Sequence, residues 1–402
     1  MTAVGRCQVA IAGAGPVGTV LATLLAQAGI DVVVIETGED CAQDLRASTF
    51  HPPTLEMLDQ IGITPMLLEK GLKAPVYHWR DRQSGEVIDF DLAEIADVTR
   101  YPFRIQCEQY HLSRALAEGL AQYPNAKVRF SSRLLTFNDD GAGVDIAIET
   151  MVGIERLRAD YLIGADGANS IVRKWLGVEF DGFTYPERFL CLSTELELAD
   201  HLPNLALVNY VSDPEEWLVL LRVPSLWRIL VPTDGTQSDD VLRSDATKNA
   251  IFDRLIGNGA DVVTQHRTLY RVHQRVAKSF REGRVLLAGD ASHLNNPLGG
   301  FGMNSGIHDA FNLFEKLLPI LKGQVSNDEG LALYDRQRRT VTHSFTQTQT
   351  KENMAMIKGG QDDAHQRRRD AMLEIKQDDT RRRAYMLRQA MYQSLEEAAA
   401  IT

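Results

Sequence analysis

The first 36 residues show a change of hydrophobic periodicity that is typical of a βαβ unit. A short apolar run at residues 9–12 is followed by a glycine cluster, and apolar residues then recur at helical spacing up to Ala28. Residues 31–35 form a second apolar run, rich in β-branched side chains. Because parallel strands need a crossover connection, this order predicts two parallel strands joined by a helix over residues 8–36.

The rest of the chain alternates between β and helical periodicity. Residues 77–105 alternate apolar and polar positions, residues 108–122 show apolar spacing of three to four, and residues 177–272 contain short Val- and Leu-rich strands. A buried-strand pattern returns at residues 285–288, before a helix over residues 304–321. The pattern predicts a mixed α/β (α+β) fold in which a mainly β domain interrupts a discontinuous α/β domain.

The segment from residue 341 to the end is polar and highly charged. It contains the arginine triplets 367–369 and 381–383, interleaved with Asp370, Glu374, Asp378 and Asp379. This mixture predicts solvated helices. A membrane-binding or RNA-binding patch is the alternative interpretation, but the interleaved acids cancel much of the positive field.

Composition excludes several classes of protein. The 402 residues are 44% apolar and 24% charged, which is ordinary for a globular chain of two to three units and unlike a disordered one. Lys plus Arg at 43 against Asp plus Glu at 54 gives 43 − 54 = −11, which disfavours nucleic acid as a partner. The four cysteines include no C-x-x-C pair, so no disulfide framework or metal site is predicted.

The sequence also bears on the cellular compartment and on the oligomeric state. The apolar runs are shorter than the roughly 18 residues that a membrane span requires, and the amino terminus lacks the pattern of a secretory signal. A cytoplasmic protein without a membrane span is therefore expected. The oligomeric state stays open, a homodimer included.

The first chemical motif is a glycine fingerprint, Gly13-Ala14-Gly15-Pro16-Val17-Gly18, between the first predicted strand and its helix. Gly13 permits a tight turn, Gly15 lets the backbone approach a pyrophosphate at the helix amino terminus, and Gly18 allows close helix–strand packing. Glu36, 18 residues after Gly18, would accept a hydrogen bond from a ribose hydroxyl. The motif predicts a site for FAD or NAD rather than NADP; a glycine-rich turn without a ligand is the alternative.

A second motif follows the strand at residues 285–288. Asp290 is placed to offer a carboxylate to hydroxyl groups, and glycines at residues 299–302 expose backbone N–H groups before the next helix. Such a site suits a polyol chain joined to an electron-accepting ring. The alternative is that Asp290 only caps a turn.

Together with a middle motif at residues 164–170, these segments resemble the FAD-dependent aromatic hydroxylases, the group A flavoprotein monooxygenases typified by 4-hydroxybenzoate 3-monooxygenase. The resemblance covers roughly the first 320 residues and implies a Rossmann-like FAD-binding domain, a β-sheet substrate domain and a helical carboxy terminus. The implied boundaries are 1–76, 105–177 and 273–340 for the FAD-binding domain, 77–104 and 178–272 for the substrate domain, and 341–402 for the helical segment.

The resemblance also assigns cofactor contacts. The first motif would hold the adenosine end of FAD, Arg46 and Gln106 its pyrophosphate and ribityl region, Asp290 a ribityl hydroxyl, and the Gly302–Met303 backbone the pyrimidine edge. The middle-motif residue Asp166 supports FAD and the passage of the reductant, or else only fixes its loop through backbone N–H groups. The full set of expected cofactor residues is Gly13, Gly15, Val17, Gly18, Glu36, Arg46, Gln106, Asp166, Asp290, Gly300, Gly302, Met303 and Asn304.

The activity implied by the resemblance is hydroxylation of a small aromatic or N-heteroaromatic substrate, phenolic or carboxylate, with O2 as co-substrate. NADH or NADPH would act as a transient reductant, and oxygen would pass through a flavin C4a-hydroperoxide. Pro297 would lie beside that group, and His51 and His293 are candidates for proton transfer. Aromatic walls with a cation suit an aromatic acid, which makes Tyr210, Trp217, Arg222 and Arg228 candidate substrate residues.

Asn296-Pro297 and Phe301 depart from the family's usual residues, so the substrate cannot be inherited from a named relative. Alternatives left open are a FAD-dependent reductase, dehydrogenase or halogenase, a flavin-binding protein without turnover, and a hydroxylase of membrane-embedded quinone precursors. The halogenase is disfavoured because its paired-tryptophan motif is reduced to Trp227 followed by Pro232.

Overall fold

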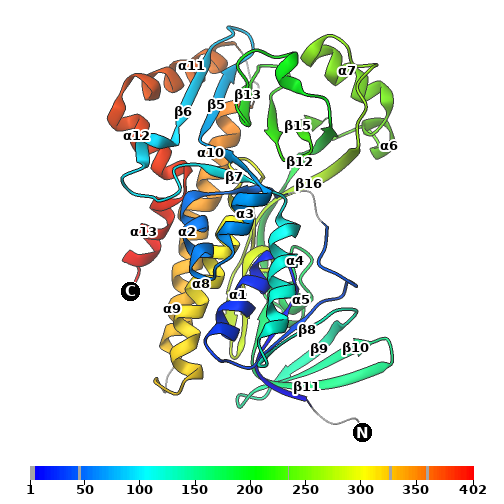
Figure 1. The fold of residues 1–402 in the computed structure, drawn as a ribbon, viewed down its shortest axis with the longest axis vertical. Helices are drawn as coiled ribbons and strands as arrows, with labels where there is room; N and C mark the ends of the chain where they lie inside the picture. Colours follow the sequence, from blue (N-terminus) through cyan, green and yellow to red (C-terminus); the bar gives the residue numbers. More distant parts are fainter. Residues whose placement is uncertain (1–4, 44–46, 234, 326–327, 359–361) are drawn as a thin grey trace.

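The computed structural model describes residues 5–43, 47–233, 235–325, 328–358 and 362–402. Two large β-sheets lie at opposite ends of the molecule, and a small three-stranded sheet lies between them. Figure 1 shows the first sheet with helices α1, α4, α8 and α9 in the lower half, and the second sheet with α6, α7, α11 and α12 in the upper half. The expected mixed α/β class is confirmed.

The first sheet is built on the predicted βαβ unit. Strand β1 (Gly5–Ala12) pairs in parallel with β2 (Val32–Ile35), and helix α1 (Pro16–Gln27) connects them. Strand β11 (Gly153–Gly164) pairs in parallel with the other edge of β1. The sheet is completed by β8 (Ala126–Arg129), β9 (Arg133–Asp139), β10 (Val144–Thr150), β17 (Arg281–Glu282) and β18 (Val285–Leu287).

Helices cover this sheet and bring later motifs to its carboxyl edge. Helix α8 (Phe301–Leu321) starts three residues earlier than the predicted 304 and packs against α1. Around the core lie α2 (Pro52–Gln60), α3 (Thr64–Lys70), α4 (Gln109–Gly119), α5 (Ile171–Leu176) and α9 (Glu329–Val341). Because the parallel strands end at one edge, the residues that follow β1, β2, β11 and β18 converge there.

The small sheet joins the two halves. Its central strand β7 (Arg104–Gln106) pairs with β3 (Thr49–Phe50) on one side and with β4 (Leu72–Ala74) on the other. Strand β4 leads directly into β5 (Val76–Asp81) of the second sheet. Polar residues on one face of β7 can therefore reach both halves of the molecule.

The second sheet is mainly antiparallel and has the strand order β19-β16-β12-β15-β14-β13-β5-β6. Its strands are β6 (Val87–Asp91), β12 (Phe180–Thr194), β13 (Val208–Ser212), β14 (Leu218–Arg222), β15 (Trp227–Thr233), β16 (His266–Ala277) and β19 (His293–Leu294). Helices α6 (Asp239–Leu242) and α7 (Asp245–Ile256) follow β15.

The carboxy-terminal helices are not the solvated elements that their charge pattern predicted. They are α10 (Thr348–Ile357), α11 (Asp362–Gln377), α12 (Asp379–Gln389) and α13 (Tyr392–Ala400), and α11 contacts β6 of the second sheet. Met372, Met386 and Met391 are fully buried within them. The prediction failed because a few apolar residues suffice to dock helices whose other faces carry ion pairs, such as Arg382 with Glu94 at 2.9 Å.

Within the described residues, no helix is long and apolar enough to cross a membrane. The domain boundaries given above remain a prediction, and they are used below only to name the two halves.

Candidate functional site

A cavity of about 640 Å³ lies between the carboxyl edge of the first sheet and one face of the second. One end is lined by the glycine fingerprint, Glu36, residues 165–169 and Asp290. The other end is lined by Cys191, Val208, Tyr210, Val219, Leu221, Arg228, Leu230, Tyr270 and Val272. Pro297, Leu298, Gly300, Gly302 and Met303 line its wall between these two ends.

The fingerprint glycines are required by close backbone contacts. A Cβ on Gly13, whose φ is +102°, would lie 2.5 Å from the Ala165 carbonyl oxygen, and a Cβ on Gly18 would lie 2.0 Å from the Gly13 carbonyl oxygen. Gly15 lines the cavity and has open space on its Cβ side. The backbone at Gly15, beside the amino terminus of α1, is therefore accessible to a phosphate group.

Glu36 lies at the end of β2, beside the fingerprint. Its carboxylate accepts hydrogen bonds from the Ala14 N–H at 2.8 Å and the Gly38 N–H at 2.9 Å. The side chain lines the cavity and is only partly buried. A carboxylate held in this way leaves lone pairs for a ribose hydroxyl and would repel a 2′-phosphate.

Two buried polar atoms near the middle of the cavity lack a partner among the described residues. The Gln106 side chain accepts a hydrogen bond from Thr49 Oγ1 at 2.9 Å, but its Nε2 donates to no atom. The Ser48 hydroxyl is also without a partner. Buried donors of this kind are normally satisfied, so they fit a ligand such as the ribityl region of FAD. Arg46 lies outside the described residues.

Asp166 lines the cavity, but its carboxylate already accepts hydrogen bonds from the protein. It accepts hydrogen bonds from the Ser170 hydroxyl at 2.5 Å, the Ile171 N–H at 2.7 Å and the Val172 N–H at 3.1 Å. Burial raises the pKa of Asp166. These contacts fix the middle loop at the start of α5, which is the structural alternative stated above for this residue.

The turn that carries Asp290 is held by a buried ionic network. Asp309 of α8 accepts hydrogen bonds from the Gly289 N–H at 3.0 Å, from His293 Nε2 at 2.9 Å and from Arg338 Nε at 2.6 Å. The Arg338 guanidinium holds the pKa of Asp309 at about 2, although burial alone would raise it. Asp290 itself lines the cavity, so the network places a carboxylate at this end of it.

Helix α8 points its amino terminus at the cavity wall. Gly300 is the residue before the helix and has a φ of +71°, and Gly302 and Met303 of the first turn line the cavity. Their backbone N–H groups are thus available to an electron-rich ring edge. The Asn304 side chain instead donates to the Thr49 carbonyl at 2.8 Å and the Gly300 carbonyl at 2.7 Å, and Asn304 is not a lining residue of the cavity; its role as a cofactor residue stays a prediction.

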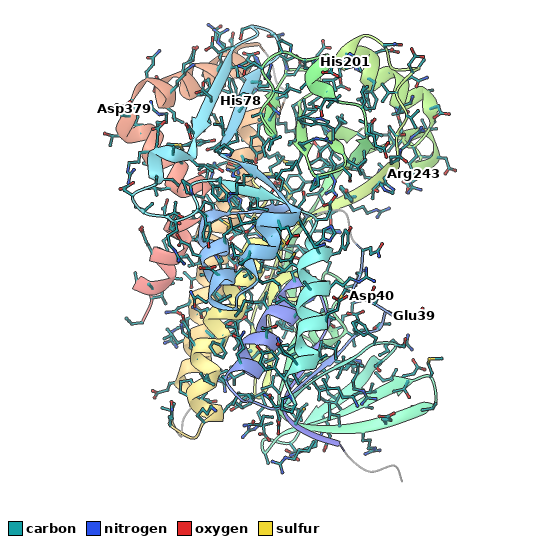
Figure 2. All side chains as sticks on the ribbon, in the orientation of Figure 1. Glu39, Asp40, His78, His201, Arg243 and Asp379 are labelled. Atoms are coloured by element: carbon teal, nitrogen blue, oxygen red, sulfur yellow. The ribbon has the colours of Figure 1, made fainter. Side chains whose placement is uncertain are left out.

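The structure does not bring the two candidate catalytic histidines to the cavity. His51 and His293 are both fully buried, His51 on the Gly299 carbonyl at 2.7 Å and His293 on Asp309. His78, on β5 in the upper half, is likewise not a cavity residue (Figure 2). The two assignments are corrected because each imidazole supports a loop, whereas Pro297 does line the cavity as expected.

Among the expected substrate residues, Tyr210 and Arg228 line the cavity and the other two do not. Trp217 packs edge-on against Phe189, with ring centroids 5.4 Å apart, inside the second sheet. Arg222 pairs with Glu197 at 3.5 Å, outside the cavity. The roles of Trp217 and Arg222 are therefore corrected: cross-strand neighbours use both side chains.

Sequence reasoning missed Tyr270, Cys191 and Glu108 at this end of the cavity. Tyr270 and Cys191 line it, and Glu108 forms a buried ion pair with Arg228 at 3.4 Å. Cys191 pairs with Leu230 across β12 and β15, so strand alternation could have placed it once the register was known. No sequence signal links Glu108 to Arg228, 120 residues away.

Comparison with known proteins identifies the class. Residues 6–349 match the family model described as FAD binding domain. The chain belongs to the FAD-dependent aromatic hydroxylases, the group A flavoprotein monooxygenases. It is therefore a flavoprotein enzyme that uses FAD to hydroxylate an aromatic or N-heteroaromatic substrate, with NAD(P)H and O2.

Particular relatives lie within this class. The chain is 34% identical over 372 residues to para-nitrophenol 4-monooxygenase of Pseudomonas sp. strain WBC-3, covering 91% of each chain. It is 32% identical to 6-hydroxy-3-succinoylpyridine 3-monooxygenase of Pseudomonas putida, covering 83% of this chain and 84% of the relative. The crystal structure of p-nitrophenol 4-monooxygenase from Pseudomonas putida DLL-E4 superposes with a TM-score of 0.91 at 30% identity, covering 98% of this chain and 99% of that one.

Proposed function

We propose that this monooxygenase acts on a single-ring phenol or hydroxypyridine that carries a second, electron-accepting polar group. The observation that carries the proposal is a buried arginine, Arg228, in an otherwise mostly apolar end of the cavity. The named substrates of the two relatives above, p-nitrophenol and a hydroxylated succinoylpyridine, have this composition.

Arg228 has N–H donors that no described residue accepts. Its side chain is only 4% exposed and faces Glu108, itself 7% exposed, through Nη2 at 3.4 Å. Nε and Nη1 are buried without a partner among the described residues. A guanidinium can only donate, so the group that satisfies these atoms must be an acceptor such as a nitro, carboxylate or carbonyl oxygen.

The remaining walls suit a flat, apolar ring. Four apolar residues lie on the same sheet face as Arg228 and line the cavity: Val208, Val219, Leu221 and Leu230. Tyr210 lies on this face at the edge of the group. Apolar walls exclude water from the reacting carbon and favour ring binding by burial. Arg271 and His273 also line the cavity, but Arg271 is exposed and His273 half-buried, so we propose that the buried Arg228 orients the substrate.

When bound, FAD supplies the electron transfer and the oxygen activation of this enzyme class. For this chain we propose that the Gly15 backbone and Glu36 hold its adenosine half, Gln106 and Asp290 its ribityl chain, and the first turn of α8 its ring. The sequence has no second glycine fingerprint for a resident nicotinamide nucleotide, so NADH or NADPH is proposed to bind transiently.

The test uses the FAD-loaded enzyme and a set of phenols that differ only in the group across the ring. Arg228→Met should raise KM for nitro- and carboxyl-bearing phenols by about 10-fold to 100-fold, which matches about 1.5–3 kcal/mol for a charge-assisted hydrogen bond. Phenols with a methyl group in that place should change little. Arg228→Lys should restore part of the loss.

Arg222→Met is the matched control, because it removes an equal charge from the same sheet outside the cavity. It should leave every KM near the wild-type value. Equal KM values in Arg228→Met and the wild type, with FAD still bound, would show that Arg228 does not hold the substrate.

We also propose a cytoplasmic location and a test for a homodimer. The four cysteines are free and buried, which suits a reducing cytoplasm. A homodimer is the assembly to be tested by sedimentation of the FAD-loaded enzyme. Nucleic acid is not proposed as a partner.

A further inference from the structure

Arg104 is a buried cation for which the described residues supply no counter-ion. Arg104 is 1% exposed, its Nε and Nη1 have no hydrogen-bond partner, and no described carboxylate forms an ion pair with it. Its guanidinium carbon lies 4.1 Å from the centroid of the Tyr77 ring. Burying an unpaired charge is costly, so its retention calls for a compensating role.

Strand register places Arg104 at the junction of the two ends of the cavity. In the antiparallel β3–β7 pair, Thr49 is opposite Gln106. Two residues further along each strand, the same register places His51 opposite Arg104, on the same face as Thr49 and Gln106. On the other side, Tyr77 packs edge-on against the cavity residue Tyr210, with centroids 6.3 Å apart. Arg104 thus lies behind the wall where the substrate ring would meet the flavin loop.

The groups around Arg104 carry no compensating charge. Burial and the charge of Arg104 hold the pKa of His51 well below its ordinary value, so its imidazole is neutral. Burial raises the pKa of Tyr77 and of Tyr385, so both phenols keep their protons. Glu94 is the carboxylate whose charge acts on Tyr77. Both of its oxygens accept a hydrogen bond from Arg382 Nε, each at 2.9 Å, so its charge is already paired.

Arg228 and Tyr77, the residue on which Arg104 is stacked, lie at opposite ends of one row of the second sheet. Arg228 pairs with Leu221, and Leu221 with Val208. The Asn209–His78 pair places Val208 beside Tyr77, on which Arg104 is stacked. Three strand spacings of about 4.8 Å separate the ends of the row, roughly 14 Å. One aromatic ring with a polar group at each end fits between Arg228 and Tyr77, and the Arg104 charge then acts on the far end of the ring from behind Tyr77, without touching it.

We infer that Arg104 is a positioning residue whose unpaired charge, behind the end of the row opposite Arg228, keeps the hydroxyl of a bound phenol ionised. The inference rests on the proposed substrate class. The O–H bond of the phenol breaks on binding, the electron pair stays on oxygen, and the proton leaves to bulk water. The resulting phenolate is the more electron-rich ring for oxygen transfer.

The test measures the ionisation of p-nitrophenol bound to the oxidised, FAD-loaded enzyme without reductant, by absorbance over a pH series. In the wild type the pKa of the bound phenol should be lower than that of the free phenol. Arg104→Met should raise it by about one unit, the effect of a unit charge some 10 Å away at an effective dielectric near 20. Arg104→Lys should restore the wild-type value.

Arg284→Met is the matched control: Arg284 also stacks on a tyrosine, Tyr161, and belongs to the first sheet's side of the molecule. It should leave the pKa of the bound phenol unchanged. A second measurement needs no variant: below the pKa of the free phenol, binding to the wild type should release protons into a weakly buffered dye solution.

An unchanged bound-phenol pKa in Arg104→Met, an equal rise in Arg104→Lys, or no proton release by the wild type would overturn the inference. A shift confined to the reduction potential of FAD in Arg104→Met would overturn it too, because the charge would then act on the flavin. Failure of the proposed function is seen separately, as a wild-type enzyme that binds no phenol of the set, and the inference falls with it.

Discussion

At the scale of single residues, the site is built from side chains that keep spare hydrogen-bonding capacity. Gln106 Nε2, Arg228 Nε and Nη1, and the Ser48 hydroxyl are all buried without a described partner. Ser48 and Arg228 line the cavity of about 640 Å³ and Gln106 bonds the lining residue Thr49, so a ligand accounts for these atoms better than packing defects do. By contrast, Trp217 and Arg222 do not line the cavity: Trp217 packs on Phe189 and Arg222 pairs with Glu197, although Arg222 Nη1 is also buried without a described partner.

Glu36 gives a residue-scale prediction for the cofactor. Replacing Glu36 by Ala should weaken FAD binding by about tenfold to 100-fold, because a hydrogen bond to a charged group contributes about 1.5–3 kcal/mol. Titration of FAD fluorescence quenching measures the change.

Glu39→Ala is the control, since Glu39 is exposed beside the same loop (Figure 2). It should bind FAD as the wild type does. If Glu36→Ala also retained wild-type affinity, the assignment of the adenosine end would be contradicted.

Sequence patterns were most informative where backbone geometry restricts residue choice. The roles of Gly13 and Gly18 follow from a motif that is local in sequence, although the steric contact that requires Gly13 is with the distant Ala165 carbonyl and only that of Gly18, with the Gly13 carbonyl, is local. Tyr210 and Arg228 were found by residue type, but nothing in the sequence separates them from Trp217 and Arg222. That separation depends on strand register and on partners more than 25 residues away, such as Glu108 for Arg228.

At the scale of elements, the ion pair between α8 and α9 holds the turn that presents Asp290. Asp309 joins the Gly289 backbone, His293 and Arg338, and Arg338 also bonds the Ser305 carbonyl in α8 at 3.3 Å. The turn and the start of α8 are thus tied together through two side chains. Both contribute to the proposed flavin site, so damage to this network should affect cofactor binding before it reaches the substrate end.

The network predicts a pH dependence. The pKa of Asp309, about 2, lies below the ordinary carboxyl value near 3.9, so the ionised form stabilises the fold. That contribution is fully present above about pH 4 and is lost as the pH falls toward 2. Asp309→Asn should lower the free energy of unfolding at pH 7 by about 3–5 kcal/mol, because it leaves Arg338 buried without its partner, and should flatten the loss of stability below pH 4.

Denaturant unfolding followed by circular dichroism, with FAD affinity measured in parallel, tests this. Asp379→Asn is the control, because Asp379 is 91% exposed and its ion pair with Arg382 should contribute under about 1 kcal/mol (Figure 2). A variant at Asp309 as stable and as tightly FAD-bound as the wild type would show that the network does not position the turn.

At the scale of the whole molecule, the chain crosses between its two halves several times, and the cavity lies where they meet. Residues after β1, β2 and β11 of the first sheet and residues of β13, β14, β15 and β16 of the second sheet all line it, so both halves contribute to the cavity. Of the charged carboxy-terminal helices, α11 lies against β6 at the edge of the second sheet, whereas α13 packs against α9 (Figure 1). Charge pattern alone did not reveal this docking, because few of the residues in these helices are apolar and buried, among them Met372 and Met386.

The most direct test of the central claim is a single-turnover reaction of the FAD-loaded enzyme with NADH or NADPH, p-nitrophenol and isotopically labelled O2. The account predicts substrate-stimulated oxidation of the reductant and a ring product that carries one labelled oxygen atom. Label found only in hydrogen peroxide, with no oxygenated product from p-nitrophenol or any other phenol or hydroxypyridine of the set, would contradict it.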